Sequence, residues 1–126
     1  MGIIGVGTDL VEIKRIAQVV SKYGKKFSHR ILSDYELLKF NKNCYPVNFL
    51  AKRFAVKEAA AKAFGLRSGK MFQHFEIFHD SYGQPHLKCL QTVALIAEEI
   101  GVKCIHITIT DERKYALATV IIETNS

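Results

Sequence analysis

The sequence predicts an α+β fold in which a small antiparallel sheet packs against a long, largely buried helix and shorter helices. Three observations lead to this fold class. The chain has 126 residues, of which 48% are apolar and 24% charged, as expected for one compact domain spanning 1–126. Segments at both ends alternate in the manner of strands, and Pro46 to Phe64 is apolar on nearly every side.

The first predicted element is a strand over Gly2–Thr8, where glycine alternates with isoleucine and valine. Asp9 would then lie at a strand-to-helix junction. A helix is expected from about Leu10 to Tyr23, because apolar residues recur there at helical spacing while basic and polar residues occupy another face. Gly24 is expected to end this amphipathic helix.

Two further helices are indicated by their end signals. Ser33 and Glu36 fit a capping box, in which the serine hydroxyl and the glutamate carboxylate satisfy each other's free backbone N–H groups, so a short helix through Phe40 should follow. The long helix should begin at Pro46 and end at Gly65, since proline favours the first helical position and glycine follows the last.

The second half of the chain predicts the remaining strands and one more helix. Asp80 to Pro85 is rich in turn-forming residues and Gly101 should close the helix, so both mark boundaries. The expected elements are strands over Phe72–His79, near Leu87, over Cys104–Thr110 and over Tyr115–Ile122, with a helix over Leu90–Ile100.

Composition excludes several classes of protein. The apolar segment from Met1 to Gly7 is short and follows no basic residues, so it is read as a strand and not as a signal peptide. No apolar run reaches membrane-spanning length, so no membrane partner is expected. Three cysteines without CxxC spacing argue against a disulfide framework and a structural zinc site, and favour reduced thiols in a cytoplasmic protein: Cys44, Cys89 and Cys104.

The net charge of +6 is unevenly distributed. Between Lys14 and Arg53 there are ten lysines or arginines against Asp34 and Glu36, which gives +8, and the remainder of the chain gives −2. A basic first half suggests an anionic partner, which on charge alone is a nucleic acid, a phosphate-bearing cofactor or an acidic protein. A solubilising surface is the alternative.

Three ionisable residues are candidates for chemistry. Glu58 and Lys62 lie one turn apart on a helix otherwise rich in alanine and phenylalanine, where charges are costly without a ligand or metal to compensate them. A simple surface ion pair is the alternative for these two residues, and a helix cap is the alternative for Asp9. Two carboxylates from separate elements can hold Mg²⁺, so Asp9 and Glu58 form the predicted metal pair.

Two blocks of the sequence resemble the signatures of the holo-[acyl-carrier-protein] synthases, a family of 4'-phosphopantetheinyl transferases. They are Gly5–Ile13 (GVGTDLVEI) and Arg53–Ala63 (RFAVKEAAAKA), and the likeness extends over essentially the whole chain. The resemblance implies Mg²⁺-dependent attack by a serine of acyl carrier protein on the β-phosphate of coenzyme A, in support of fatty acid biosynthesis. It also implies the phosphopantetheinyl transferase fold.

The resemblance assigns roles to individual residues. Asp9 and Glu58 would hold Mg²⁺ on the diphosphate, with Lys62 adding positive charge. Glu58, or a water that it orients, would accept the serine proton. Arg53 could bind a phosphate of coenzyme A, with an exposed helix arginine as the alternative. His106 matches a family histidine that contacts the nucleotide, with a structural histidine as the alternative.

The resemblance also names partners. The carrier proteins of the family are acidic, so the basic side of the first helix should dock one through Lys14, Arg15 and Lys22, with a solvated face as the alternative. A homotrimer with active sites at subunit interfaces is implied. In the loop after the long helix this chain departs from the family, and Arg67 and Lys70 would there supply charged contacts to the nucleotide.

Two other classes of function are alternatives to the transferase. A basic RNA-binding module would suit an isoelectric point near 9.3, but no nucleic-acid motif is present, so no nucleic-acid partner is expected. A non-catalytic protein that binds coenzyme A or carrier protein is the second alternative. The intact set of Asp9, Glu58 and Lys62 argues for the enzyme.

Overall fold

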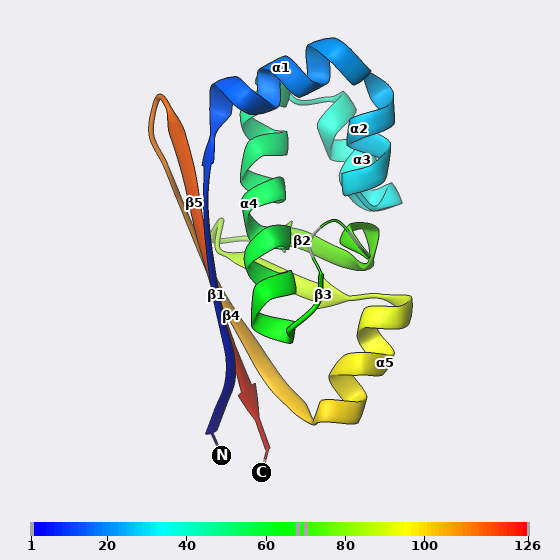
Figure 1. The fold of residues 1–126 in the computed structure, drawn as a ribbon, viewed down its shortest axis with the longest axis vertical. Coiled ribbons are helices and arrows are strands. Elements are labelled where there is room, and N and C mark those ends of the chain that lie inside the picture. The colour runs from blue at the N-terminus through cyan, green and yellow to red at the C-terminus, as the bar shows by residue number, and fades with distance from the viewer. Residues whose placement is uncertain (1, 68, 70, 126) are drawn as a thin grey trace.

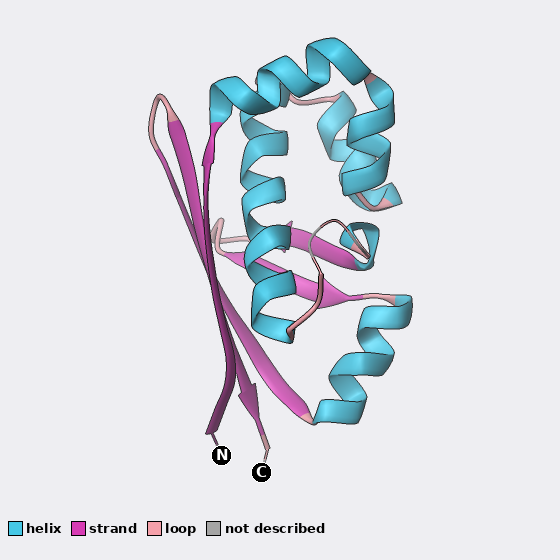
Figure 2. Cartoon of the chain, viewed as in Figure 1, coloured by secondary structure: helices cyan, strands magenta, loops and turns pink. Residues whose placement is uncertain are grey.

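The computed structural model describes residues 2–67, 69 and 71–125, and its elements are shown in Figures 1 and 2. The α+β prediction is confirmed. The order along the chain is β1 (Gly2–Glu12), α1 (Ile13–Tyr23), α2 (Lys25–Ile31), α3 (Asp34–Asn41), α4 (Pro46–Phe64), the 3-10 turn η1 (Phe72–His74), β2 (Phe75–His79), β3 (Pro85–Cys89), α5 (Gln91–Ile100), β4 (Val102–Asp111) and β5 (Tyr115–Thr124).

The main sheet has three antiparallel strands in the order β1-β5-β4. The long helix α4 covers one face of this sheet, which we call the inner face, and the opposite side is the outer face (Figure 1). Alternate residues of β5 from Ala116 to Ile122 are fully buried on the inner face. The hydrophobic core therefore surrounds α4, which itself buries eleven residues and packs against the sheet on one side and against other helices and β2 on its remaining sides.

The helix α4 can approach β1 closely because two glycines face it. A Cβ atom on Gly7 would lie 1.8 Å from the carbonyl oxygen of Ala59, and one on Gly5 would lie 1.9 Å from that of Ala63. Neither contact is possible for a side chain, and the obstructing atoms are backbone atoms that cannot rotate away. The alternation of glycine in the first strand is thus a packing requirement of the helix.

We expect Gly7→Ala to lower the free energy of unfolding by roughly 1 to 3 kcal/mol, since the added methyl group forces the strand and the helix apart. Urea unfolding followed by circular dichroism would measure the change. Gly2→Ala is the matched control, because nothing lies within 4 Å of a Cβ atom at Gly2. Equal stability of the two variants would contradict the packing argument.

The remaining elements lie on the side of α4 away from the sheet or beside it (Figure 1). Helix α3 begins with the predicted capping box, in which Ser33 accepts from the Glu36 N–H and Glu36 accepts from the Ser33 N–H. Strands β2 and β3 form a separate antiparallel hairpin. Among the described residues, no helix combines the length and apolar character that crossing a membrane requires.

Several elements differ from the sequence prediction. Strand β1 continues to Glu12, and α1 begins only at Ile13, so the prediction of a helix from Leu10 is wrong. The cause is cross-strand pairing. Leu10 pairs with Leu117 and Glu12 pairs with Tyr115, and this pairing outweighs the helical pattern of the sequence. The segment over 72–74 is a 3-10 turn and not strand, and the helix α2 was not predicted.

Candidate functional site

Asp9 lies within β1 and not at its end, so both the predicted strand-to-helix junction and the helix-cap alternative are wrong. It pairs with Ala118 of β5, whose side chain is fully buried on the inner face. Lys62 of α4 reaches this strand: its Nζ atom donates to the Thr8 carbonyl at 2.9 Å and lies 3.3 Å from Asp9 Oδ1. The structure therefore brings together two of the predicted site residues.

The carboxyl group of Asp9 is poorly solvated, with 16% of its side chain exposed against 53% for Lys62. Burial raises the pKa of Asp9, and the hydrogen bond and charge of Lys62 oppose that shift. The positive charge of Lys62 thus offsets only part of the cost of burying the Asp9 carboxylate. A divalent cation at this position would complete the compensation, which is an electrostatic reason for expecting a metal here.

Glu58 is positioned by the same helix. It lies one turn before Lys62, on the side of α4 that carries the contact to Asp9. Along β1, Gly5 meets Ala63 and Gly7 meets Ala59, so Asp9, the next residue on that face, is level with the turn before Ala59. Glu58 is part of this turn of α4, directly before Ala59. The geometry is consistent with the predicted carboxylate pair, which stays a prediction.

Two carboxylates suit Mg²⁺, which prefers oxygen ligands and keeps several positions for water and phosphate. The residues present therefore fit this ion, and Asp9 and Glu58 would be its protein ligands. Lys62 would lie beside the bound ion and add positive charge for an anionic substrate. The arrangement is suited to holding a diphosphate.

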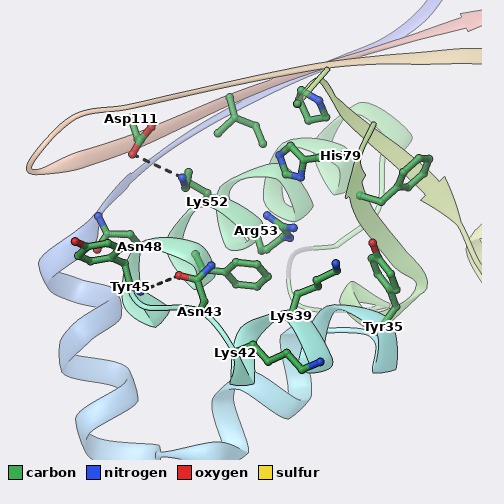
Figure 3. A pocket seen from close by; sticks show the side chains of 15 residues that line it. Tyr35, Lys39, Lys42, Asn43, Tyr45, Asn48, Lys52, Arg53, His79 and Asp111 are labelled. Carbon is green, nitrogen blue, oxygen red and sulfur yellow. Dashed lines mark hydrogen bonds and ion pairs between the residues drawn. The ribbon is translucent and has the colours of Figure 1, made fainter. Parts of the chain in front are cut away.

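A separate cavity of about 670 Å³ opens on another side of α4. Figure 3 shows Arg53, Lys52, Lys39 and His79 directed toward this hollow from α4, α3 and β2. Lys52 also lies 3.9 Å from Asp111. Burial, followed by the charges of Arg53 and Lys52, lowers the pKa of His79. The cavity is electropositive, and its lining is Tyr35, Lys39, Lys42, Asn43, Tyr45, Asn48, Phe49, Lys52, Arg53, Phe78, His79, Gly83, Pro85, Ile109 and Asp111.

Arg53 is a buried residue that lines this cavity. Its side chain is only 6% exposed, so the alternative of an exposed helix arginine is wrong. The Nε atom lies 3.4 Å from Glu36 Oε2, and the guanidinium lies 4.1 Å from the centre of the Phe49 ring. A guanidinium that is ordered before binding loses less entropy on meeting a phosphate. The predicted phosphate contact remains a prediction.

Glu36 is also the partner of Lys57, and both side chains are fully buried. Lys57 Nζ lies 2.5 Å from Glu36 Oε1 and donates to the carbonyls of Ile31 at 2.6 Å and Phe72 at 2.8 Å. The other oxygen of Glu36 accepts from the Ile77 N–H at 3.0 Å. Burial lowers the pKa of Lys57 to about 8, against the opposing effect of Glu36. This cluster joins α2, α3, α4, η1 and β2 through one carboxylate and one ammonium.

His106 lies on the outer face of the main sheet, where it contacts Glu123 and Cys104. Asp9 lies on the inner face, so one subunit does not bring His106 to the Asp9–Lys62 pair. On α1 the side chains of Lys14, Arg15 and Lys22 are all exposed, as their predicted docking role requires. Arg67 is exposed too, whereas Lys70 lies outside the described residues.

Sequence reasoning missed the Glu36–Lys57 pair and most of the cavity. Lys57 is a charged residue flanked by apolar residues in a largely buried helix, and that pattern could have predicted a buried partner. Glu36 was predicted only as a capping residue. The cavity residues come from segments far apart in the chain, so their spacing carries no signal.

Comparisons with known proteins agree with this geometry. A family model described as the 4'-phosphopantetheinyl transferase superfamily matches residues 5–120. A holo-[acyl-carrier-protein] synthase of Yersinia enterocolitica is 54% identical over 125 residues, covering 98% of this chain and 99% of its own length.

Solved structures of holo-[acyl-carrier-protein] synthases also resemble this chain. The crystal structure of a holo-[acyl-carrier-protein] synthase from Neisseria meningitidis has a TM-score of 0.92 at 41% identity, with 98% of this chain and 100% of that chain covered. The synthase from Bacillus anthracis, solved in complex with CoA (3',5'-ADP), has a TM-score of 0.79 at 31% identity, with 98% of each chain covered. The likeness thus extends over nearly the full length of each protein.

Proposed function

Because the chain belongs to the 4'-phosphopantetheinyl transferase superfamily and is a member of its holo-[acyl-carrier-protein] synthases, we propose the following reaction for it. It transfers 4'-phosphopantetheine from coenzyme A to a serine of apo acyl carrier protein, in support of fatty acid biosynthesis. The serine Oγ forms a bond to the β-phosphorus, and the bond from that phosphorus to the leaving oxygen breaks. The products are holo acyl carrier protein and adenosine 3',5'-bisphosphate.

The observation that carries this proposal is the contact of Lys62 with Asp9 on a helix that also presents Glu58. When bound by Asp9 and Glu58, Mg²⁺ would neutralise charge that develops on the diphosphate. Lys62 holds a positive charge beside the same oxygens. Glu58, or a water that it orients, accepts the proton of the serine hydroxyl.

The second substrate contact region is Arg53 in the electropositive cavity. Arg53 and Glu58 are five residues apart, which places them about 140° apart around the axis of α4. His106 lies on the outer face of the sheet. One subunit therefore presents the predicted substrate contacts in different directions, and a neighbouring subunit would complete the site. This supports a homotrimer with active sites at subunit interfaces.

The outer face of the sheet also suits an interface, because apolar side chains are exposed on it. Val6 is 59% exposed and Leu10 is 62% exposed, and Leu117 lies opposite Leu10 on β5. Exposed apolar residues on neighbouring strands are typical of a protein-protein contact.

We expect Leu10→Asp to break the assembly and lower transferase activity, because a carboxylate would be buried between subunits without a partner. Light scattering coupled to size-exclusion chromatography measures the mass. Leu95→Asp on α5 is the matched control, since Leu95 is 68% exposed and lies on a different element. If the wild type is a fully active monomer, the trimer proposal is wrong.

The exposed basic side chains of α1 would dock the acidic carrier protein. We expect Arg15→Glu to lower kcat/KM for the carrier by about tenfold at low salt, with a smaller difference as salt rises. Initial rates over a salt series measure both effects. Lys88→Glu on β3 makes the same charge change at another exposed position and should leave kcat/KM nearly unchanged. Equal losses in the two variants would indicate a general charge effect.

Mixing the protein with apo acyl carrier protein, coenzyme A and Mg²⁺, and weighing the carrier by mass spectrometry, tests the proposal directly. A gain equal to the phosphopantetheine group is expected, and it should require Mg²⁺. No gain would favour the non-catalytic binding protein, or the RNA-binding module if the protein retains RNA in a filter assay. We propose that this reaction takes place in the cytoplasm.

A further inference from the structure

Three potential metal ligands gather on the outer face of the main sheet. Cys104 and His106 are alternate residues of β4, and Glu123 of β5 is the register partner of Cys104. A register shift between Val102 and Cys104 interrupts regular pairing here. The topology thus brings a thiol, an imidazole and a carboxylate to one point, although Glu123 is 19 residues from Cys104 in the chain.

The ligand atoms of these three side chains lie close together. Cys104 Sγ lies 3.2 Å from His106 Nε2 and 3.5 Å from Glu123 Oε1, and His106 Nε2 also contacts Glu123 Oε1. All three atoms lie within 4.8 Å of one another. Ligands of tetrahedral zinc, at bond lengths of about 2.0 to 2.3 Å, are separated by roughly 3.4 to 3.6 Å. The two separations of Cys104 Sγ are close to that value.

We propose that Cys104, His106 and Glu123 form a binding site for one Zn²⁺ ion per chain, with the fourth position open to water or another ligand. Sulfur, nitrogen and oxygen donors together suit zinc and do not suit Mg²⁺. On binding, the Cys104 thiol releases its proton to solvent and the thiolate ligates the metal. Three protein ligands and an open position are typical of zinc sites that exchange or react, and not of structural sites.

Within one chain, this site is distinct from the proposed carboxylate pair at Asp9. Asp9 pairs with Ala118, five residues before Glu123 on β5, which corresponds to about 17 Å along the strand. Asp9 also belongs to the inner face, whereas Cys104, His106 and Glu123 lie on the outer face. The zinc site shares His106 with the predicted nucleotide contact, but it is argued from its own geometry and stands without the proposed reaction.

Titration of the reduced, assembled full chain with Zn²⁺, in competition with a chromophoric chelator, tests the site. We expect one Zn²⁺ per chain, and an affinity lowered by at least about tenfold in Cys104→Ser and in Glu123→Gln, since each variant loses one of three ligands. Cys44→Ser is the matched control, because Cys44 is an exposed cysteine outside the cluster. It should bind as tightly as the wild type.

Cobalt gives a readout that reports the ligand atoms themselves. Co²⁺ in place of Zn²⁺ should give a thiolate-to-metal charge-transfer band that is present in Cys44→Ser and absent in Cys104→Ser. Circular dichroism would verify that each variant is folded. The proposal is overturned if the chain does not compete with the chelator, if Cys104→Ser binds as tightly as the wild type, if Cys44→Ser weakens binding equally, or if excess Mg²⁺ displaces the zinc.

Discussion

Glu58→Gln is expected to lower the rate of phosphopantetheine transfer by at least about 100-fold while leaving the fold intact. The amide keeps the shape of the side chain but loses the charge that would hold Mg²⁺ and accept a proton. Glu58 also shares its side of α4 with Lys62, which contacts Asp9, the other proposed metal ligand. Transfer rates measured by mass spectrometry across a Mg²⁺ series give the size of the loss.

Two companion variants make the result specific. Glu98→Gln, an exposed residue of α5, makes the same chemical change away from the site and should retain full activity. Asp9→Asn should resemble Glu58→Gln and should raise the Mg²⁺ concentration needed for half-maximal rate. Full activity of Asp9→Asn beside an inactive Glu58→Gln would show that the two carboxylates do not share one metal.

Lys57→Met should lower the free energy of unfolding by about 3 to 5 kcal/mol. The ammonium is the closest positive charge to Glu36, and both side chains have no exposed surface. Removing it leaves a buried carboxylate whose charge is compensated by the Arg53 contact at 3.4 Å and by the N–H groups of Ser33 and Ile77. The carbonyls of Ile31 and Phe72 would also lose their donor. Urea unfolding at fixed protein concentration measures the loss.

Lys52→Met on the same helix is the control for that experiment. Lys52 is 36% exposed and lies 3.9 Å from Asp111, so its replacement should cost less than about 1 kcal/mol. Adding Glu36→Gln to Lys57→Met should restore part of the stability, because the unpaired charge is then removed as well. A double variant less stable than Lys57→Met would show that Glu36 stabilises the fold mainly through Ser33, Ile77 and Arg53.

The elements that the sequence predicted well are those with local end signals. Helix α4 has the predicted bounds because Pro46 and Gly65 act within a single turn of chain, and the capping box of α3 likewise needs only four residues. Strand β1 was predicted too short, since its last residues are held by β5, more than a hundred residues away in the chain. Pairing between strands so far apart in the chain leaves no pattern in the local sequence.

The candidate site was likewise predicted only in the part that local sequence determines. Asp9, Glu58 and Lys62 were chosen from residue types inside two motif blocks, and the structure brings Asp9 and Lys62 into contact. The electropositive cavity and the cluster of Cys104, His106 and Glu123 were not predicted, because their members come from separate elements. Counting cysteine spacings in particular cannot detect a site that strand register assembles.

By itself the sequence determined the family, the fold class, the long buried helix and the residue types available for chemistry. The tertiary structure decided which of those residues meet: Lys62 with Asp9, Lys57 with Glu36, and His106 with Glu123. The physical reason is that propensity, capping and periodicity act over a few residues, whereas ion pairs and metal ligands depend on strand register and helix packing that connect distant segments of the chain.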